Sequence, residues 1–187
     1  MGAFSDAELS GYLAVGHANG HGTSAGPMAE AVDKSLSKLT QSDIAAIVVY
    51  LRSVPAISTP DLTAPKATPA PSDHRQSVAA NVDPLGRAVF EGTCASCHSW
   101  TGVSVLTPFA TLTGARAVND PTAINVAQIV ISGADRQTPV GRVFMPAFGD
   151  AYSDSESAAV ANYVTARFGA QHSAITSEDV AKLRGLP

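Results

Sequence analysis

The stretch CASCH, Cys94 to His98, contains both cysteines of this 187-residue chain and constrains its fold more than any other feature. Two thiols separated by two residues can form thioethers to the vinyl groups of a haem, and the adjacent imidazole can then reach the iron. A chain with a covalent haem must surround it with its own apolar side chains. The stretch therefore predicts one covalent haem c, attached through Cys94 and Cys97, with His98 as an axial ligand.

The same five residues fit two other kinds of site less well. A closed zinc site needs about four ligands, and the sequence has no second cysteine pair. His17 and His21 are four residues apart, but Asn19-Gly20 between them indicates a loop rather than a helical metal-binding pair. A thioredoxin-type dithiol would accompany parallel strands, which the sequence does not predict. Zinc and dithiol chemistry remain the alternatives.

A second axial ligand to the iron is expected from the methionines or the remaining histidines. The candidates are Met1, Met28, Met145, His17, His21, His74 and His172. Met145 is favoured because GRVFMPAFG lies in a predicted loop downstream of CASCH, although a core methionine, a distal histidine or an open position remains an alternative. Histidine and methionine together raise the reduction potential and fill both axial positions, which favours electron transfer over binding of oxygen or peroxide.

Two further residues are candidates for contact with the haem. Arg142 can neutralise a haem propionate, or it can be an ordinary solvated loop residue. Trp100 can donate its indole N–H to a propionate, or it can cover the haem edge.

A proline-rich stretch divides the chain into unequal parts. PAISTPDLTAPKATPAP, from Pro55 to Pro71, disfavours helix and strand hydrogen bonds, so we expect a linker over residues 55–77. Residues 1–54 precede it, and residues 78–187 form the predicted haem domain. Both parts read as all-α because helical periodicity is present and strand-like alternation is absent.

The expected helices have recognisable ends. Ser5 with Glu8, Thr40 with Asp43 and Ser153 with Glu156 have the spacing of capping boxes. Asp83-Pro84 can start the helix that delivers Cys94, with Leu85, Val89 and Phe90 on one face, and Pro121 can start a helix that ends at Gly133. We expect Gly86 and Phe90 to cross the last helix, which ends at Gly169, at Tyr163 and Val164.

An internal repeat relates the two parts. Gly16 precedes Met28 by twelve residues, as Gly133 precedes Met145. Tyr50 follows Thr40 by ten residues, as Tyr163 follows Ser153. Residues 1–54 are therefore interpreted as the back half of a preceding module, in which Met28 corresponds to Met145. Their apolar helix faces should pack on the haem domain, pair with another chain or stay partly mobile.

Composition excludes several classes of protein. The net charge is −4 and there is no Lys/Arg cluster, which argues against a nucleic-acid partner. The longest apolar run, around Ile44 to Leu51, is far shorter than the ~20 residues of a membrane span. No signal peptide is visible at Met1, and the repeat favours a chain that begins within a longer protein.

These segments resemble class I cytochromes c, specifically the C-terminal part of the three-haem cytochrome c subunits of bacterial membrane-bound alcohol, aldehyde and gluconate dehydrogenases. GRAVFEGTCASCH and GRVFMPAFGDAYSDSESAAVANYVTARFG are similar to the third haem domain of that family. FSDAELSGYLAVG, SAGPMAEAV and LTQSDIAAIVVYLRSVP resemble the back half of its second domain.

The resemblance implies an electron-transfer role, with substrate oxidation done by a dehydrogenase catalytic subunit. It also implies a quinone or terminal oxidase as acceptor, and a periplasmic location at the face of the inner membrane, with peripheral membrane association through the complex. By the same resemblance, Met28 would ligate a haem whose attachment motif this chain lacks. Pro108 is displaced from the family pattern, which leaves the acceptor of the His98 ring N–H open. A haem peroxidase, or a ligand-binding or sensory haem domain, is the rival function.

Overall fold

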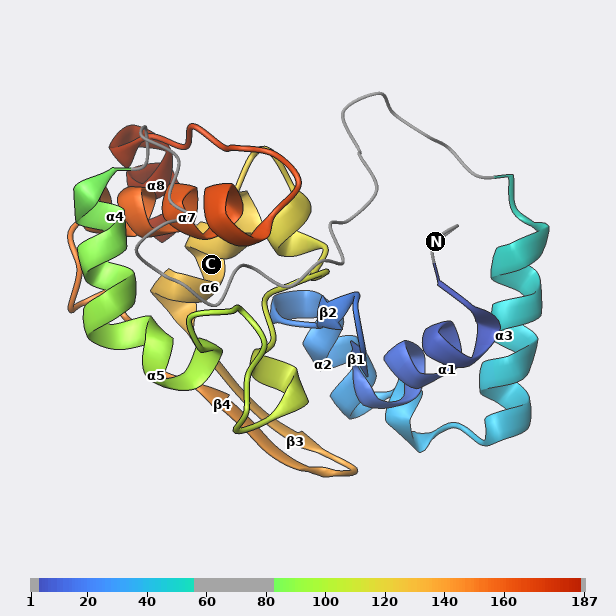
Figure 1. Cartoon of the computed structure of the whole chain (residues 1–187). Helices are drawn as coiled ribbons and strands as arrows, with labels where there is room; N and C mark the ends of the chain where they lie inside the picture. Colours follow the sequence, from blue (N-terminus) through green and yellow to red (C-terminus); the bar gives the residue numbers. More distant parts are fainter. Residues whose placement is uncertain (1–3, 56–82, 186–187) are drawn as a thin grey trace.

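The computed structural model describes residues 4–55 and 83–185, which form two helical regions side by side (Figure 1). We call residues 4–55 the N-terminal region and residues 83–185 the C-terminal region. The predicted linker, 55–77, falls almost wholly outside the described residues and stays a prediction. The chain is mostly helical, but each region also contains a short antiparallel hairpin, so the expected all-α class is too narrow.

The N-terminal region contains three helices and a small hairpin, and its first and third helices pack on each other. Its elements are α1 (Asp6–Val15), β1 (His17–Ala18), β2 (Gly22–Thr23), α2 (Gly26–Lys34), a 3-10 turn (Leu36–Lys38) and α3 (Gln41–Ser53). The capping boxes predicted at Ser5 and Thr40 are both formed. Gly16 ends α1 with a positive φ of 78°, which glycine adopts without strain.

The apolar faces of α1 and α3 pack on each other. Leu9 and Leu13 of α1 meet Ile44 and Val48 of α3, and all four side chains are buried. The partly buried residues around them are Phe4, Met28, Leu36, Ile47 and Leu51. The N-terminal region thus forms an apolar cluster of its own rather than using the C-terminal region to cover these faces.

The C-terminal region contains most of the buried core. Its elements are α4 (Pro84–Val89), a π-helical turn (Phe90–Cys94), α5 (Ala95–His98), 3-10 turns at Pro108–Ala110 and Ala117–Asn119, α6 (Ile124–Ser132), β3 (Ala134–Thr138), β4 (Gly141–Met145), α7 (Asp154–Phe168) and α8 (Ser177–Arg184). α6 begins at Ile124, three residues after the predicted start. α8 was not predicted, although Thr176 and Asp179 form a fourth capping box.

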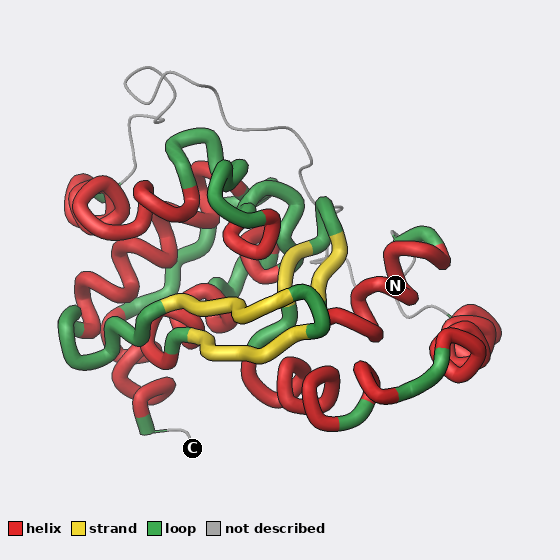
Figure 2. Tube along the Cα trace, turned by 90° about the horizontal axis from the view of Figure 1, so that it is seen from below, coloured by secondary structure: helices red, strands yellow, loops and turns green. Residues whose placement is uncertain are grey.

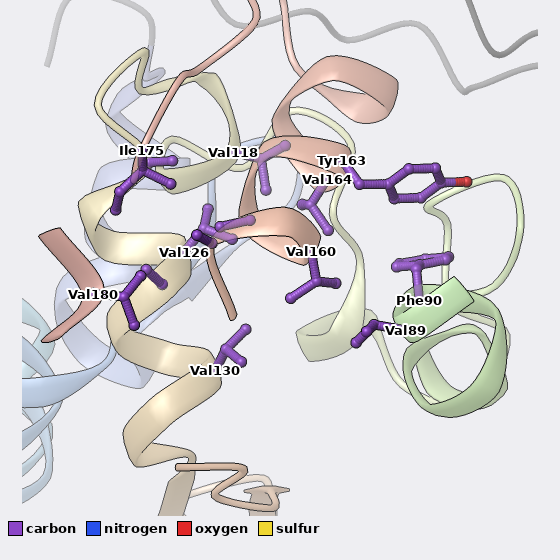
Figure 3. Close-up of a cluster of buried hydrophobic side chains, with 14 of the residues drawn as sticks. Val89, Phe90, Val118, Val126, Val130, Val160, Tyr163, Val164, Ile175 and Val180 are labelled. Carbon is purple, nitrogen blue, oxygen red and sulfur yellow. The ribbon is translucent and has the colours of Figure 1, made fainter. Parts of the chain in front are cut away.

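The crossing of α4 and α7 lies where the sequence predicted it. A Cβ atom on Gly86 would lie 2.1 Å from the Ala159 carbonyl oxygen, so only glycine allows this approach. The Phe90 and Tyr163 rings are 5.3 Å apart beside this contact (Figure 3). Leu85 departs from the prediction, because it is 41% exposed and does not share the buried face of α4.

No helix within the described ranges is both long and apolar enough to cross a bilayer.

Candidate haem site

One helical run presents the whole CASCH motif. α4, the π-helical turn and α5 follow without a break, and the Ala95 N–H donates to the Phe90 carbonyl five residues earlier. Both cysteines are free thiols, with Cys94 half-buried and Cys97 exposed. Burial raises the pKa of the Cys94 thiol to about 11, and nearby Cys97 adds to this rise. In the haem-free chain, Cys94 is therefore protonated at neutral pH.

His98 is held in the tautomer that an iron ligand needs. Its Nδ1 lies 2.6 Å from the carbonyl oxygen of Ala110. Because a carbonyl only accepts, Nδ1 carries the proton and the lone pair of Nε2 is available for the metal. Burial lowers the pKa of His98, against the opposing effect of the Ala110 hydrogen bond, and so favours the neutral ring.

The Ala110 carbonyl resolves a point that the sequence left open. Pro108 begins the 3-10 turn Pro108–Ala110, whose last residue supplies the acceptor. Pro108 thus still belongs to the turn that supports His98. The acceptor is a backbone carbonyl, which every residue type has, so the sequence could not identify it.

Met145 lies at the end of a β-hairpin rather than in the predicted loop. β3 and β4 pair in antiparallel register, with Met145 opposite Ala134 and Val143 opposite Arg136. Directly opposed residues share a face of a sheet, so Arg136, Val143 and Met145 lie on the same side of the hairpin. A Cβ on Gly133, whose φ is +65°, would lie 2.6 Å from the Met145 carbonyl oxygen, so glycine permits this close return of the chain.

The predicted attachment residue Cys94 and the candidate ligand Met145 pack against the same buried core. The partly buried residues on that core include Cys94, Ala95, Trp100, Leu112, Met145, Phe148 and Tyr152. The hydroxyl groups of Thr93 and Tyr152 are hydrogen bonded, which ties the segment after Met145 to the residue before Cys94. Cys94 and Met145 therefore border the same buried cluster, and the Thr93–Tyr152 contact links the segments next to them.

Trp100 belongs to this cluster and Arg142 does not. The centroid of the Trp100 ring lies 6.1 Å from that of the Phe90 ring. The backbone carbonyl oxygen of Trp100 accepts a hydrogen bond from Arg167 Nη2 at 2.9 Å. Arg142 lies on the opposite face of the hairpin from Met145, where it pairs with Asp135 through two hydrogen bonds of 2.7 Å. Its side chain is 57% exposed. In this arrangement Arg142 is occupied by Asp135, and its contact with a propionate stays a prediction.

The other candidate ligands lie elsewhere. Met28 is the third residue of α2 and packs on the apolar cluster of the N-terminal region. The ring nitrogens of His17 lie 2.9 Å from the Thr23 hydroxyl and 3.1 Å from the Asn19 side-chain oxygen. His172 is exposed, and Met1 and His74 fall outside the described residues. In residues 4–55 and 83–185, no three His, Cys, Asp or Glu side chains group as a metal site.

The donor set fits a haem. A neutral imidazole with a free Nε2, two thiols one helical turn apart and a half-buried thioether are the groups that a c-type haem uses. Cys94, Cys97, His98 and Met145 would hold the group, and the half-buried Trp100 lies two residues beyond His98.

Comparison with known proteins matches part of this chain to a family model and nearly all of it to several cytochrome subunits. The cytochrome c family model matches residues 85–167. The fructose dehydrogenase cytochrome subunit of Gluconobacter japonicus is 32% identical over 98% of this chain, and the gluconate 2-dehydrogenase cytochrome c subunit of Pantoea cypripedii is 31% identical over 98%. The cytochrome c subunit of alcohol dehydrogenase (quinone) of Gluconobacter oxydans is 28% identical over 98%.

These alignments cover 41%, 42% and 38% of the relatives, so the chain spans about two fifths of their length. The chain carries a cytochrome c domain and is related over nearly its whole length to the cytochrome subunits of fructose, gluconate and alcohol dehydrogenases.

Proposed function

We propose that this chain transfers electrons one at a time through a single haem c, attached at Cys94 and Cys97, with His98 and Met145 as axial ligands. The observation that carries the proposal is the hydrogen bond from His98 Nδ1 to Ala110, which leaves Nε2 free to bind iron. When bound, the haem iron supplies the one-electron chemistry. The protein fixes the tautomer of His98, surrounds the site with apolar side chains and offers Met145 as a soft ligand.

The names of the relatives suggest the partners. Because they are cytochrome subunits of dehydrogenases, we propose that this chain accepts electrons from a dehydrogenase catalytic subunit and does not itself oxidise the substrate. A quinone or a terminal oxidase is the proposed acceptor. The proposed location is the periplasm, at the face of the inner membrane, with peripheral attachment through the complex.

We also interpret residues 1–54 as the back half of a second cytochrome module. Both regions run from a helix through a glycine and a hairpin to a capping-box helix, α1 to α3 in one and α6 to α7 in the other. The N-terminal region differs in having α2, which contains Met28, and a 3-10 turn between the hairpin and α3. In this interpretation Met28 corresponds to Met145, and this chain provides no thioether attachment for a haem at Met28.

Replacement of Met145 tests the proposed ligation. Met145→His should remove the far-red absorption band of thioether-to-iron coordination and lower the reduction potential, because imidazole donates more strongly to iron. The haem should stay covalently attached in this variant, whereas Cys94→Ala should leave it weakly held. Persistence of the far-red band in Met145→His would show that another residue is the ligand.

Carbon monoxide distinguishes the rival function. A haem peroxidase or ligand-binding domain needs an open or displaceable sixth position, and its reduced haem binds carbon monoxide readily. The proposed electron-transfer site should resist carbon monoxide, and its reversible reduction should occur at a positive potential in voltammetry.

A further inference from the structure

A buried arginine joins the N-terminal region to the hairpin that carries Met145. Arg136 of β3 is 4% exposed, and its guanidinium donates to both carboxylate oxygens of Asp33 in α2, at 3.0 Å from Nε and 2.7 Å from Nη2. It also donates to the carbonyl oxygens of Ser24 at 3.1 Å and Val15 at 3.3 Å. Within the described parts of the chain, the acceptors of this guanidinium, on Asp33, Ser24 and Val15, thus belong to the N-terminal region.

The N-terminal region is shaped to receive this guanidinium. A Cβ on Gly16 would lie 2.5 Å from Arg136 Nη2, so the absence of a side chain there makes room for it. Val15 is the last residue of α1, and the negative end of that helix dipole favours a cation. The buried positive charge of Arg136 is therefore balanced by the carboxylate of Asp33 and by hydrogen bonds. Loss of Asp33 would leave this charge buried without compensation.

Arg136 acts on the hairpin close to Met145. It lies opposite Val143 and shares a face with Met145, which is two residues further along β4. α2 therefore contacts β3, and β4, the partner strand of β3, ends in the candidate ligand; Figure 2 shows this hairpin in yellow on the side of the C-terminal region that faces the N-terminal helices.

The N-terminal region also contacts the support of His98. The Thr23 hydroxyl donates to the Phe109 carbonyl at 3.0 Å, and the His17 and Phe109 rings lie 4.8 Å apart. Phe109 directly precedes Ala110, the acceptor of the His98 ring proton. The N-terminal region thus contacts both the turn that supports His98 and the hairpin that ends in Met145.

From these contacts we propose that Asp33 and Arg136 are positioning residues that hold Met145 on the haem iron. The inference rests on the proposed ligation by Met145 and adds a role for the N-terminal region, which is to restrain the hairpin that carries this ligand. A looser hairpin releases the thioether more often, and each release exposes the sixth position of the iron.

Stopped-flow mixing of the reduced, haem-loaded full chain with carbon monoxide tests this role. Asp33→Asn should raise the rate of carbon monoxide binding about tenfold, equivalent to about 1.4 kcal/mol, and weaken the far-red band. The matched control is Glu30→Gln on the same helix, which should leave both readouts unchanged, because Glu30 is exposed and pairs with the exposed Lys34 of the same helix. Asp33→Glu should restore most of the wild-type behaviour.

The outcomes separate the inference from the function on which it rests. A folded Asp33→Asn protein with the wild-type rate and band would overturn the positioning role while leaving ligation by Met145 intact. A wild-type protein without the far-red band would contradict the ligation itself. If Asp33→Asn does not fold, Arg136→Lys retains the charge with fewer donors, and the same two readouts decide the question.

Discussion

α3 and α7 begin in the same way but differ in how much of their surface is buried. Each starts with a capping box, at Thr40 and at Ser153, and each carries a tyrosine ten residues after the cap. Tyr50 is 67% exposed, whereas Tyr163 is 1% exposed. The difference follows from α4, which crosses α7 at Gly86 and covers Tyr163, while α3 has no such helix among the described residues.

Where a helix starts depends on residues next to it in the sequence, whereas how much of it is buried depends on other parts of the chain. Capping and periodicity start both helices, because these effects act within a few residues. Coverage of the outer face depends on a second helix elsewhere in the chain. The C-terminal region has that helix, α4, which continues without a break into the π-helical turn and α5 that carry CASCH.

Truncation of the two tyrosines should give the largest contrast. Tyr163→Ala should lower the free energy of unfolding of the haem-loaded protein by roughly 3–5 kcal/mol, because it leaves a cavity beside Phe90. Tyr50→Ala should change it by less than about 0.5 kcal/mol, since its side chain is already exposed. Denaturant titration followed by circular dichroism measures both values. Similar losses in the two variants would mean that the α3 face is covered in solution.

Alanine substitutions at two helical glycines should change the free energy of unfolding by smaller amounts and in opposite directions. In Gly86→Ala, the new methyl group would collide with the Ala159 carbonyl, and we expect a loss of about 1–3 kcal/mol in the free energy of unfolding. In Gly11→Ala, within α1, the nearest atom is the His17 carbonyl oxygen at 3.8 Å, so we expect a gain of about 0.5–1 kcal/mol from helix propensity. Thermal melts of the two variants provide the measurement, and a stabilised Gly86→Ala protein would contradict the crossing.

The sequence predicted the parts of the fold that depend on neighbouring residues. Capping-box spacing indicates the helix starts at Ser5, Thr40 and Ser153, and all three capping boxes are formed. The expected crossing of Gly86 and Phe90 with the last helix is present as well. α8 was missed although Thr176 and Asp179 show the same spacing. The sequence therefore contains the signal for the start of α8 as well.

The parts that the sequence could not predict depend on distant partners. β3 and β4 lack the strict alternation that marks a half-buried strand, so their pairing was not foreseen. The pairing of Arg136 with Asp33 leaves no local pattern in the sequence, because 103 residues separate the two. Within the candidate site, the attachment residues and Met145 stay sequence predictions, whereas the Ala110 carbonyl and the Arg136 contact are visible only in the structure.

Acidification should weaken the junction between the two regions. The hydrogen bond from Arg136 holds the pKa of Asp33 below its usual value of 3.8, so the unfolded state takes up the proton first as the pH falls. The stabilising contribution of the pair is thus present above about pH 3.8 and is lost as the pH falls through the depressed pKa. Hydrogen exchange should show α2 losing protection before α7 over this range, and Asp33→Asn should abolish the difference in pH dependence.

An intact-mass measurement on the haem-loaded full chain, followed by peptide mapping, counts the covalent haems and locates their attachment. We predict the mass of the polypeptide plus a single haem, attached to the peptide that contains Cys94 and Cys97, with no haem on peptides of the N-terminal region. A mass with two covalent haems, or with none after expression in a host that matures c-type cytochromes, would contradict this prediction.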